Sequence, residues 1–489
     1  MYKRKLNQVS IFENPTMFGG IELDPNNEWV KLAALIPWWV FEKKYAERFS
    51  PTKGQPACSV RMALGAQLIK ERYQFSDEMT VAHIAMNPYL QYFIGMTEYR
   101  QTAPFEASAM TRFRQRLTVE MLADANDVVI GRKTAEQLEA EANKKEDSDD
   151  RTGGNDSGNG GAVPDKPNEG TLILDATCAP QGIRFPTDTS LLDEARRNTE
   201  GIIDSLHEAG LTEGKKPRTY RKQAKKLYNS FSKKRKKNGK SVRKARKQQL
   251  NFLRRNLKSI DSIIEKHPGN WMNALSRWQI ERLAVIRQLY TQQREMFETK
   301  NNRIDERIVS LSQSWVRPIV RGKQNAPVEF GAKVEMSDID GFLRIEQLKW
   351  NAFNEGTTLQ DSVEAYRKAY GHYPKRVLAD KIFRTRDNTR YCKAHGIHIN
   401  GPQLGKPPKD PEIRKQELQL EWLESGERGD IERRFGISKR CYSLGKITAK
   451  LKHTSEIMIH MSVLTLNLQK RLRLLLRLIF VYFRKFQIA

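Results

Sequence analysis

Cysteine is scarce in this 489-residue chain. Its four cysteines, Cys58, Cys178, Cys392 and Cys441, lie far apart, and no two of them form a CxxC pair. This usage excludes a disulfide-stabilised scaffold and favours a reducing compartment. Residues 1–15 contain no apolar run of the kind that a secretion signal carries. We therefore expect a cytoplasmic protein.

The chain also lacks a long uninterrupted hydrophobic segment. Four basic residues interrupt its apolar C-terminal run over 463–483, namely Lys470, Arg471, Arg473 and Arg477. Because such charges are unfavourable at the centre of a bilayer, we predict a packed amphipathic helix over residues 451–489 and no membrane partner. A phosphate-cradling glycine loop and a serine-nucleophile motif are missing too, so an ATPase or a serine recombinase has no support.

Acidic residues are absent from Lys215 to Lys258, where 20 Lys or Arg residues carry most of the net charge of +27. A basic segment of this kind is either a solvated face or a contact for a polyanion, with nucleic acid the first choice. The interleaved aromatic residues, Tyr220, Tyr228, Phe231 and Phe252, favour contact with the DNA backbone. Such contact is sequence-independent and salt-sensitive. The candidate DNA-binding residues are Lys233, Lys234, Arg235, Lys236, Lys237, Arg243 and Lys244.

Composition divides the chain into parts. Residues 143–170 contain six glycines and no large apolar side chain, so they form a flexible linker. Residues 1–142 before it read as an all-helical domain. Its helices are predicted in 29–45, 60–73 and 79–93, with one longer helix over 108–141. This domain is either a helix-turn-helix-like DNA binder or a helical packing domain.

After the linker, short apolar strands alternate with helices. A strand begins at Thr171 and carries Asp175. A long helical insertion follows over about 186–315 and contains the basic segment. Further strands are predicted at 316–320, 328–336, 341–346, 376–380 and 397–399, with helices at 358–370, 384–395 and 411–423. We predict an α/β domain over 171–450 with a mixed sheet flanked by helices.

Three carboxylates occupy positions from which they can meet. Asp175 and Asp380 end short strands, and Glu432 lies on a late helix. Open α/β sheets place their chemistry at strand ends, and oxygen ligands suit Mg²⁺ or Mn²⁺. Two such ions, about 4 Å apart, support displacement at a phosphodiester. Asp188, Asp338 and Asp340 lie near turns, where aspartate usually caps, so we leave them out of the metal site.

The segment around Glu432 carries a further pattern. In a helix, Arg428, Glu432 and Lys439 fall within about 40° of one another. This face is either a surface ion-pair ladder or a metal-binding acid flanked by phosphate contacts. Gly426 and Gly429 could delay the start of the helix and leave Arg428 on the preceding turn.

The sequence resembles DDE-type transposases of bacterial insertion sequences, which have a ribonuclease-H-like catalytic core. The stretches that carry the resemblance are SVRMALGAQLIKERY, AHIAMNPYLQYFIGM, LILDATCAPQGIRFPTD, PVEFGAKVEMSDIDG, RVLADKIFRTRDN and DIERRFGISKRCYSLGKITAKL. The resemblance implies that Asp175, Asp380 and Glu432 are the catalytic acids. It also implies that Arg428 and Lys439 contact DNA phosphates. Ser425 stands where related transposases have a tyrosine.

The resemblance also implies an activity and partners. The chain would cleave DNA and join the 3′-hydroxyl to a target with two Mg²⁺ or Mn²⁺ ions. Its partners would be double-stranded DNA, at element ends and target, and a second copy of the chain. A non-catalytic DNA-binding regulator and a metal-dependent nuclease without strand joining are the alternatives. Cys392, His395 and His398 have a spacing reminiscent of zinc ligands, but no fourth ligand is evident.

Overall fold

The computed structural model describes residues 18–50, 53–54, 56–134, 136–138, 140, 167–320, 328–401 and 410–486. The predicted linker lies outside these residues except for 167–170. The chain forms two compact units. Unit 1 comprises residues 1–179, 333–348 and 353–489, and unit 2 comprises residues 180–332 and 349–352.

The first part of unit 1 is helical. Its helices are α1 (Glu28–Leu35), α2 (Trp38–Ala46), α3 (Val60–Tyr73), α4 (Asp77–Met86), α5 (Pro88–Phe93), α6 (Ala107–Arg116) and α7 (Val119–Val129). The single helix predicted over 108–141 is wrong, because α6 ends at Arg116 and a new helix begins after Thr118. Thr118 has an extended backbone, and its side chain accepts a hydrogen bond from Met121 N. That cap favours a helix start at this position.

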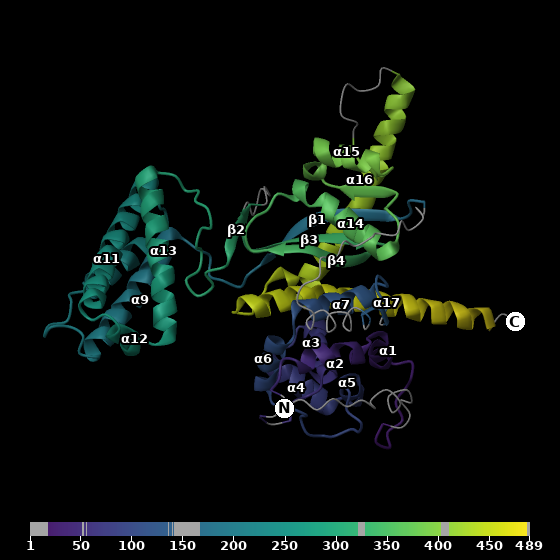
Figure 1. Ribbon diagram of the computed structural model, residues 1–489, viewed down its shortest axis with the longest axis horizontal. Coiled ribbons are helices and arrows are strands. Elements are labelled where there is room, and N and C mark those ends of the chain that lie inside the picture. Colours follow the sequence, from purple (N-terminus) through teal and green to yellow (C-terminus); the bar gives the residue numbers. More distant parts are fainter. Residues whose placement is uncertain are drawn as a thin grey trace, which may run out of the picture. The chain divides into compact units, whose positions relative to one another are not determined.

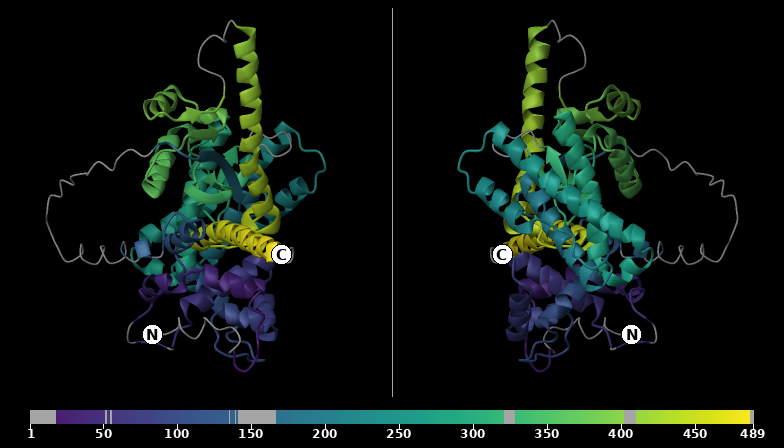
Figure 2. Two further views of the ribbon diagram at one scale, coloured as in Figure 1. Left: turned by 90° about the vertical axis from the view of Figure 1, so that its right-hand side faces the viewer. Right: turned by 90° about the vertical axis from the view of Figure 1, so that its left-hand side faces the viewer.

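Helix α17 (Lys452–Phe486) packs against these N-terminal helices. Its residues Ile457, Met461, Leu464 and Leu468 are buried in the same hydrophobic core as α1 to α7. They recur every three or four residues, so they form one stripe of the helix. Figures 1 and 2 show α17 lying along the N-terminal helices. Among the described residues, no helix combines the length and apolarity that a membrane crossing needs.

The described residues form one six-stranded sheet. Its strands are β1 (Thr171–Pro180), β2 (Arg317–Val320), β3 (Val328–Ile339), β4 (Phe342–Lys349), β5 (Arg376–Ala379) and β6 (His398–Ile399). The order is β2-β3-β1-β5-β6, and β4 also pairs with β3. Pairing is parallel between β1, β5 and β6 and antiparallel between β2 and β3. The prediction of an α/β fold with a mixed sheet is therefore confirmed.

A tight turn joins β3 to β4. Asp340 and Gly341 occupy it with φ of 50° and 80°. Two successive residues with positive φ match the twist of a hairpin, and Asp-Gly is a preferred pair there. Asn467 of α17 pairs with the backbone of β4. Its side chain accepts a hydrogen bond from Leu343 N at 3.0 Å and donates one to Leu343 O at 2.6 Å. These hydrogen bonds satisfy backbone groups that a neighbouring strand would otherwise pair.

Helices cover the sheet in unit 1. They are α14 (Leu359–Tyr370), α15 (Arg386–Ala394) and α16 (Pro411–Cys441), with short 3-10 turns η2 (Glu355–Thr357), η3 (Lys381–Phe383) and η4 (Ser443–Gly445). Leu359 and Val363 of α14 share a buried cluster with Leu172 and Leu174 of β1. Since side chains alternate along a strand, Ile173 and Asp175 point to the other face.

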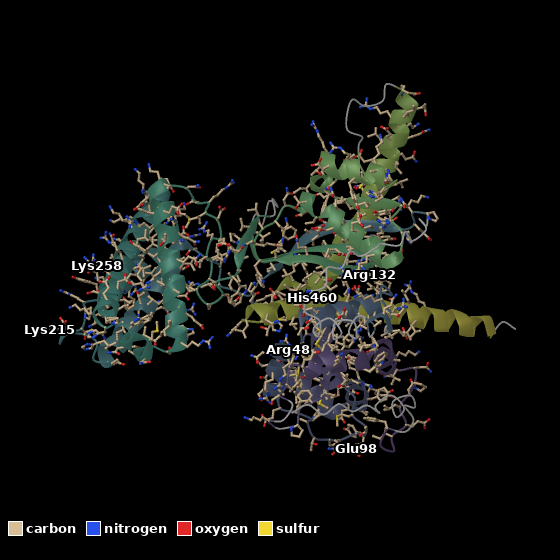
Figure 3. All side chains as sticks on the ribbon, viewed as in Figure 1. Arg48, Glu98, Arg132, Lys215, Lys258 and His460 are labelled. Atoms are coloured by element: carbon tan, nitrogen blue, oxygen red, sulfur yellow. The ribbon has the colours of Figure 1, made fainter. Side chains whose placement is uncertain are left out.

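Unit 2 consists mainly of helices. They are α9 (Asp188–Glu208), α10 (Arg221–Ser232), α11 (Gly239–Lys266), α12 (Asn270–Ala274) and α13 (Arg277–Thr299). A separate core joins α9, α11 and α13 through side chains such as Leu192, Leu253 and Ile286. The segment without acidic residues falls in this unit, and Figure 3 labels its first and last residues, Lys215 and Lys258.

Candidate functional site

Asp175 and Asp380 lie on neighbouring strands at the same level. The parallel register pairs Ile173 with Leu378 and Leu174 with Ala379, so the two aspartates are the next residues along each chain. Neighbouring strands run about 4.8 Å apart. The Asp175 carboxylate accepts a hydrogen bond from Ala176 N at 2.8 Å. Asp380 is exposed and caps η3 by accepting from Lys381 N at 2.7 Å. The prediction that Asp175 ends its strand is wrong, because β1 continues to Pro180, whereas Asp380 directly follows β5 as predicted.

Helix α16 reaches across the sheet strand by strand (Figure 1). Its side chains that contact the sheet recur at helical spacing, so they lie on one side of the helix. The contacts follow the strand order β6, β5, β1 and β3: Glu424 with His398 (2.6 Å), Glu427 with Arg376 (2.8 Å), Arg428 with Asp175 (4.0 Å) and Arg434 with Asp338. Successive turns of one helix therefore contact successive strands.

Arg428 lies between two of the predicted acids. Its Nη1 is 4.0 Å from Asp175 Oδ2 and 3.5 Å from Glu432 Oε1. The expectation that glycine delays the helix is wrong, because α16 runs without a break from Pro411 to Cys441. The same finding corrects the predicted end of a separate helix at 423. Packing of Ile431 and Phe435 and the contacts with the sheet hold the helix through Gly426 and Gly429.

The remaining residues of this face differ in exposure. The Glu432 side chain is 60% exposed, whereas Lys439 is half-buried near the end of α16. An exposed carboxylate loses little solvation, so Glu432 is available to an incoming ligand. Arg428, Glu432 and Lys439 share the helix that was predicted for them.

The environment of Asp175 shifts its ionisation. Burial raises the pKa of Asp175 to about 6, against the opposing effect of the Ala176 N–H and of Arg428. The negative charges of Glu355 and Glu432 raise this pKa further. Desolvation together with nearby like charge is typical of carboxylates in functional sites.

Sequence reasoning missed two further acids, Glu355 and Glu335, and the negative charge of Glu355 acts on both Asp175 and Glu335. Glu355 begins η2 and pairs with Lys333 at 2.7 Å. Glu335 of β3 is fully buried, where Thr358 and Ser362 donate to its carboxylate at 2.5 and 3.3 Å. Burial raises the pKa of Glu335 to about 7 despite these donors. Polar residues at alternate positions of β3 were a signal for Glu335, whereas the turn that carries Glu355 gave none.

The position of Asp338 differs from the predicted one. It was predicted to cap a turn, but it belongs to β3 and its side chain is only 1% exposed. Arg434 of α16 forms an ion pair with it. Burial raises the pKa of Asp338, although the Arg434 guanidinium lowers it. The strand extends beyond the predicted end because Arg434 provides the counter-charge that a buried aspartate needs.

The other candidates left out of the metal site have structural partners. Asp340 occupies the β3–β4 turn. Asp188 begins α9 and accepts hydrogen bonds from Gln293 and Arg307. Cys392 is fully buried, and this burial raises the pKa of its thiol to about 11. His398 contacts Glu424. All four cysteines are free.

The carboxylates fit a divalent cation by their chemistry. They offer the oxygen donors that Mg²⁺ and Mn²⁺ prefer, and a cation would relieve the repulsion that raises the pKa of Asp175. As placed, however, no three His, Cys, Asp or Glu side chains within the described ranges are grouped to hold a metal. The positive charge of Arg428 occupies the space between Asp175 and Glu432 instead.

The candidate DNA-binding residues of unit 2 form an exposed group. Lys233, Lys234, Arg235, Lys236 and Lys237 follow α10, and Arg243 and Lys244 begin α11. Two of them also cover aromatic rings, because Lys237 lies 5.4 Å from Phe231 and Arg243 lies 4.2 Å from Phe297. Phe231 and Phe252 are buried. Their predicted contribution to DNA contact is therefore replaced by a role in helix packing.

Two family models match the chain. Residues 377–469 match the transposase DDE domain, which includes Asp380 and Glu432, and residues 21–116 match a transposase domain (DUF772). An uncharacterized protein, ORF8 in the nfe locus of Rhizobium meliloti, is 35% identical over 95 residues, which are 19% of this chain and 45% of that protein. The chain thus spans less than half the length of this relative. No solved structure matches the chain.

These matches confirm the resemblance seen in the sequence. Each match covers about a fifth of the chain, and both are to domains of transposases.

Proposed function

We propose that the chain is a transposase that cleaves DNA and joins the freed 3′-hydroxyl to target DNA. The observation that carries this proposal is the convergence of three elements in unit 1. Asp175 and Asp380 follow register-matched residues of β1 and β5, and Arg428 of α16 links Asp175 to Glu432. The mixed sheet and its covering helices support a ribonuclease-H-like core for this site.

Asp175, Asp380 and Glu432 would hold Mg²⁺ or Mn²⁺ as carboxylate ligands. When bound, a pair of such ions activates the attacking oxygen and stabilises the leaving oxygen of a phosphodiester. Asp175 contributes only as its carboxylate, and its pKa of about 6 makes that form dominant above this pH. Because protons compete with the ion for this carboxylate, binding of Mg²⁺ should weaken as the pH drops below about 6.

Arg428 and Lys439 have a separate part in the proposal. Arg428 pairs with two carboxylates in the DNA-free chain. With a cation held by those carboxylates, the guanidinium of Arg428 would be free to donate to a DNA phosphate, a group that matches its geometry. Lys439 lies on the same helix and would contact a second phosphate.

The other parts of the chain complete the proposal. Residues 1–142 would recognise the element ends, and the basic helices of unit 2 would hold flanking or target DNA through its phosphates. Two ends must be brought together, so the active species would be a homodimer on DNA. In this proposal the boundaries are those predicted from the sequence: a linker over 143–170, a catalytic domain over 171–450 and a C-terminal helix over 451–489.

The test uses DNA that carries the sequences flanking the coding region. The full chain is incubated with this DNA, a target plasmid and Mg²⁺, and nicked and joined products are separated on a denaturing gel. Asp380→Asn should abolish both products, because an amide is a poor ligand for Mg²⁺. Asp387→Asn is the matched control, since Asp387 lies on α15, is 79% exposed and is none of the three proposed metal ligands.

The outcome separates the proposal from its alternatives. Equal products from wild type and Asp380→Asn would refute it. Binding without cleavage would indicate a regulator, and cleavage without joining would indicate a nuclease.

A further inference from the structure

Unit 2 contains a cavity of about 490 Å³ between α9 and α10. Its volume lies within the range of small-molecule sites, about 300–1,000 Å³. The α9 wall is a helical stripe with i, i+3, i+4 and i+7 spacing, and the α10 residues recur every three or four positions. The lining residues are Asp193, Arg196, Arg197 and Glu200 from α9 and Arg221, Lys222, Lys225, Tyr228 and Asn229 from α10.

Arg196 neutralises the two acids of the cavity. It is fully buried and contacts Asp193 at 2.6 Å and Glu200 at 2.5 Å. Arg197 also pairs with Asp193, at 3.1 Å, while 59% of its side chain is exposed. The negative charges of Asp193 and Glu200 are thus balanced by arginine within the cavity wall, so they do not determine the charge of the open side.

The open side of the cavity is basic. Lys222 and Lys225 are exposed, and within the described ranges neither of them forms an ion pair. Arg221 adds a third cation, held by Asp204 at 2.6 Å outside the lining. Tyr228 is half-buried and presents an aromatic ring to the same cavity. Cations beside a ring form a suitable environment for a phosphate attached to a base.

The start of α10 is held in an uncommon backbone conformation. Tyr220, the residue before the helix, has φ of 56° and makes no side-chain cap. Two guanidinium groups lie over its ring, that of Arg218 at 4.7 Å and that of Arg255 at 5.0 Å. A non-glycine residue with positive φ is retained only when its surroundings impose it. These contacts fix the direction in which α10 leaves the turn, and with it the position of Lys222 and Lys225.

From this arrangement we propose that the α9–α10 cavity binds a nucleoside phosphate, with Lys222 and Lys225 on the phosphate and Tyr228 against the base. Paired bases in a duplex are stacked inside it and cannot reach Tyr228. The ligand is therefore either a nucleotide of an unpaired DNA strand or a free nucleotide. The site is separate from Lys233–Lys237, whose side chains are exposed and do not line the cavity. The proposal rests on the proposed function only in taking DNA as the partner.

The experiment compares two double variants of the full chain. Lys222→Gln/Lys225→Gln removes two charges from the cavity, and Lys247→Gln/Lys258→Gln removes two exposed charges of the same basic segment outside it. Binding of a labelled single-stranded oligonucleotide and of its duplex is measured at fixed salt, with deoxythymidine monophosphate and inorganic phosphate as competitors. Tyr228→Ala is measured in the same way.

The cavity variant should weaken binding of the single strand about tenfold more than the control variant, and Tyr228→Ala should weaken it about tenfold, since stacking of one base contributes about 1–3 kcal/mol. Duplex binding should fall equally in both double variants. If deoxythymidine monophosphate displaces the single strand at a lower concentration than inorganic phosphate does, the base contributes to binding in the cavity. If the two double variants lose single-strand binding equally, or if Tyr228→Ala has no effect, the proposal is overturned.

The result is independent of strand transfer. Loss of cleavage in Asp380→Asn tests the carboxylate site, and single-strand binding by that variant should equal wild type. If the cavity variant binds the single strand like the control variant, the transposase proposal is unaffected. If the wild type does not cleave DNA, the comparison of single-strand binding can still be interpreted.

Discussion

Asp175→Asn should stabilise the metal-free protein at neutral pH. Burial and the nearby charges of Glu355 and Glu432 raise the pKa of Asp175 from 3.8 to about 6 in the folded chain. A raised folded-state pKa means that the stability contributed by the protonated carboxyl is present below pH 3.8 and is lost as the pH rises through about 6. Asparagine carries no charge at either pH and keeps an acceptor for Ala176 N.

The size of the effect follows from the shift. About two pKa units correspond to about 3 kcal/mol. The Asp175 side chain is 15% exposed, so water screens part of this energy and we expect a gain of about 2 kcal/mol at about pH 7.5. At about pH 4 the gain should shrink below about 1 kcal/mol, since both states of the wild type are then largely or partly protonated.

Urea unfolding of wild type and variant at the two pH values measures this difference. Asp380→Asn is the control, because Asp380 is exposed and asparagine is an equally good helix cap. Its free energy of unfolding should match wild type at both pH values. Adding Mg²⁺ should stabilise the wild type and leave Asp175→Asn unchanged, since only the carboxylate form favours the ion. A destabilised Asp175→Asn at about pH 7.5, or a gain that does not depend on pH, would refute the reasoning about desolvation.

Three further predictions concern other parts of the chain. Arg434→Leu should lower the free energy of unfolding by about 3 kcal/mol because it removes the ion-pair partner of buried Asp338, whereas Arg433→Leu, at an exposed ion pair, should change it by less than about 1 kcal/mol in the same urea assay. Asn467→Ala should cost about 2 kcal/mol, because Leu343 N and Asn126 Oδ1 lose their hydrogen bonds to Asn467 in a buried position, while Asn126 still donates to Leu343 O; an unchanged urea midpoint would contradict this role. Replacing Lys233–Lys237 by glutamine should weaken DNA binding for every sequence. The slope of the logarithm of the binding constant against the logarithm of the salt concentration should become shallower by about 0.9 for each DNA phosphate that the variant no longer neutralises. Weaker binding to one DNA sequence alone would be inconsistent with recognition of the backbone.

Much of the fold was readable from local signals. The helices at 60–73 and 358–370 follow from apolar periodicity, and the strands that carry Asp175 and precede Asp380 follow from short apolar runs. The break between α6 and α7 was missed because the pattern of apolar residues continues through Thr118, while the cap that begins the next helix is a single hydrogen bond.

The candidate site was predictable only in part, and Asp338 illustrates the limit. Asp338 lies just before Asp340-Gly341, a pair typical of turns, and this proximity led to the prediction of a turn aspartate. Whether an aspartate is buried depends on a nearby cation, and here that cation is Arg434, almost a hundred positions later in the chain. The same holds for Glu335 and Glu355, whose burial and charge depend on the packing of separate segments.

The sequence by itself determined the chemistry that this chain can offer: three candidate acids, one strongly basic segment and several stretches that resemble transposases. Those properties depend on residue identity and short-range periodicity, which the sequence states directly. The tertiary structure alone decided that α16 continues through Gly426 and Gly429, that Arg428 lies between Asp175 and Glu432, and that burial shifts the pKa of Asp175. The physical reason is that charge interactions and desolvation depend on distance in space, and segments far apart in the sequence are brought together only when the sheet and its helices pack.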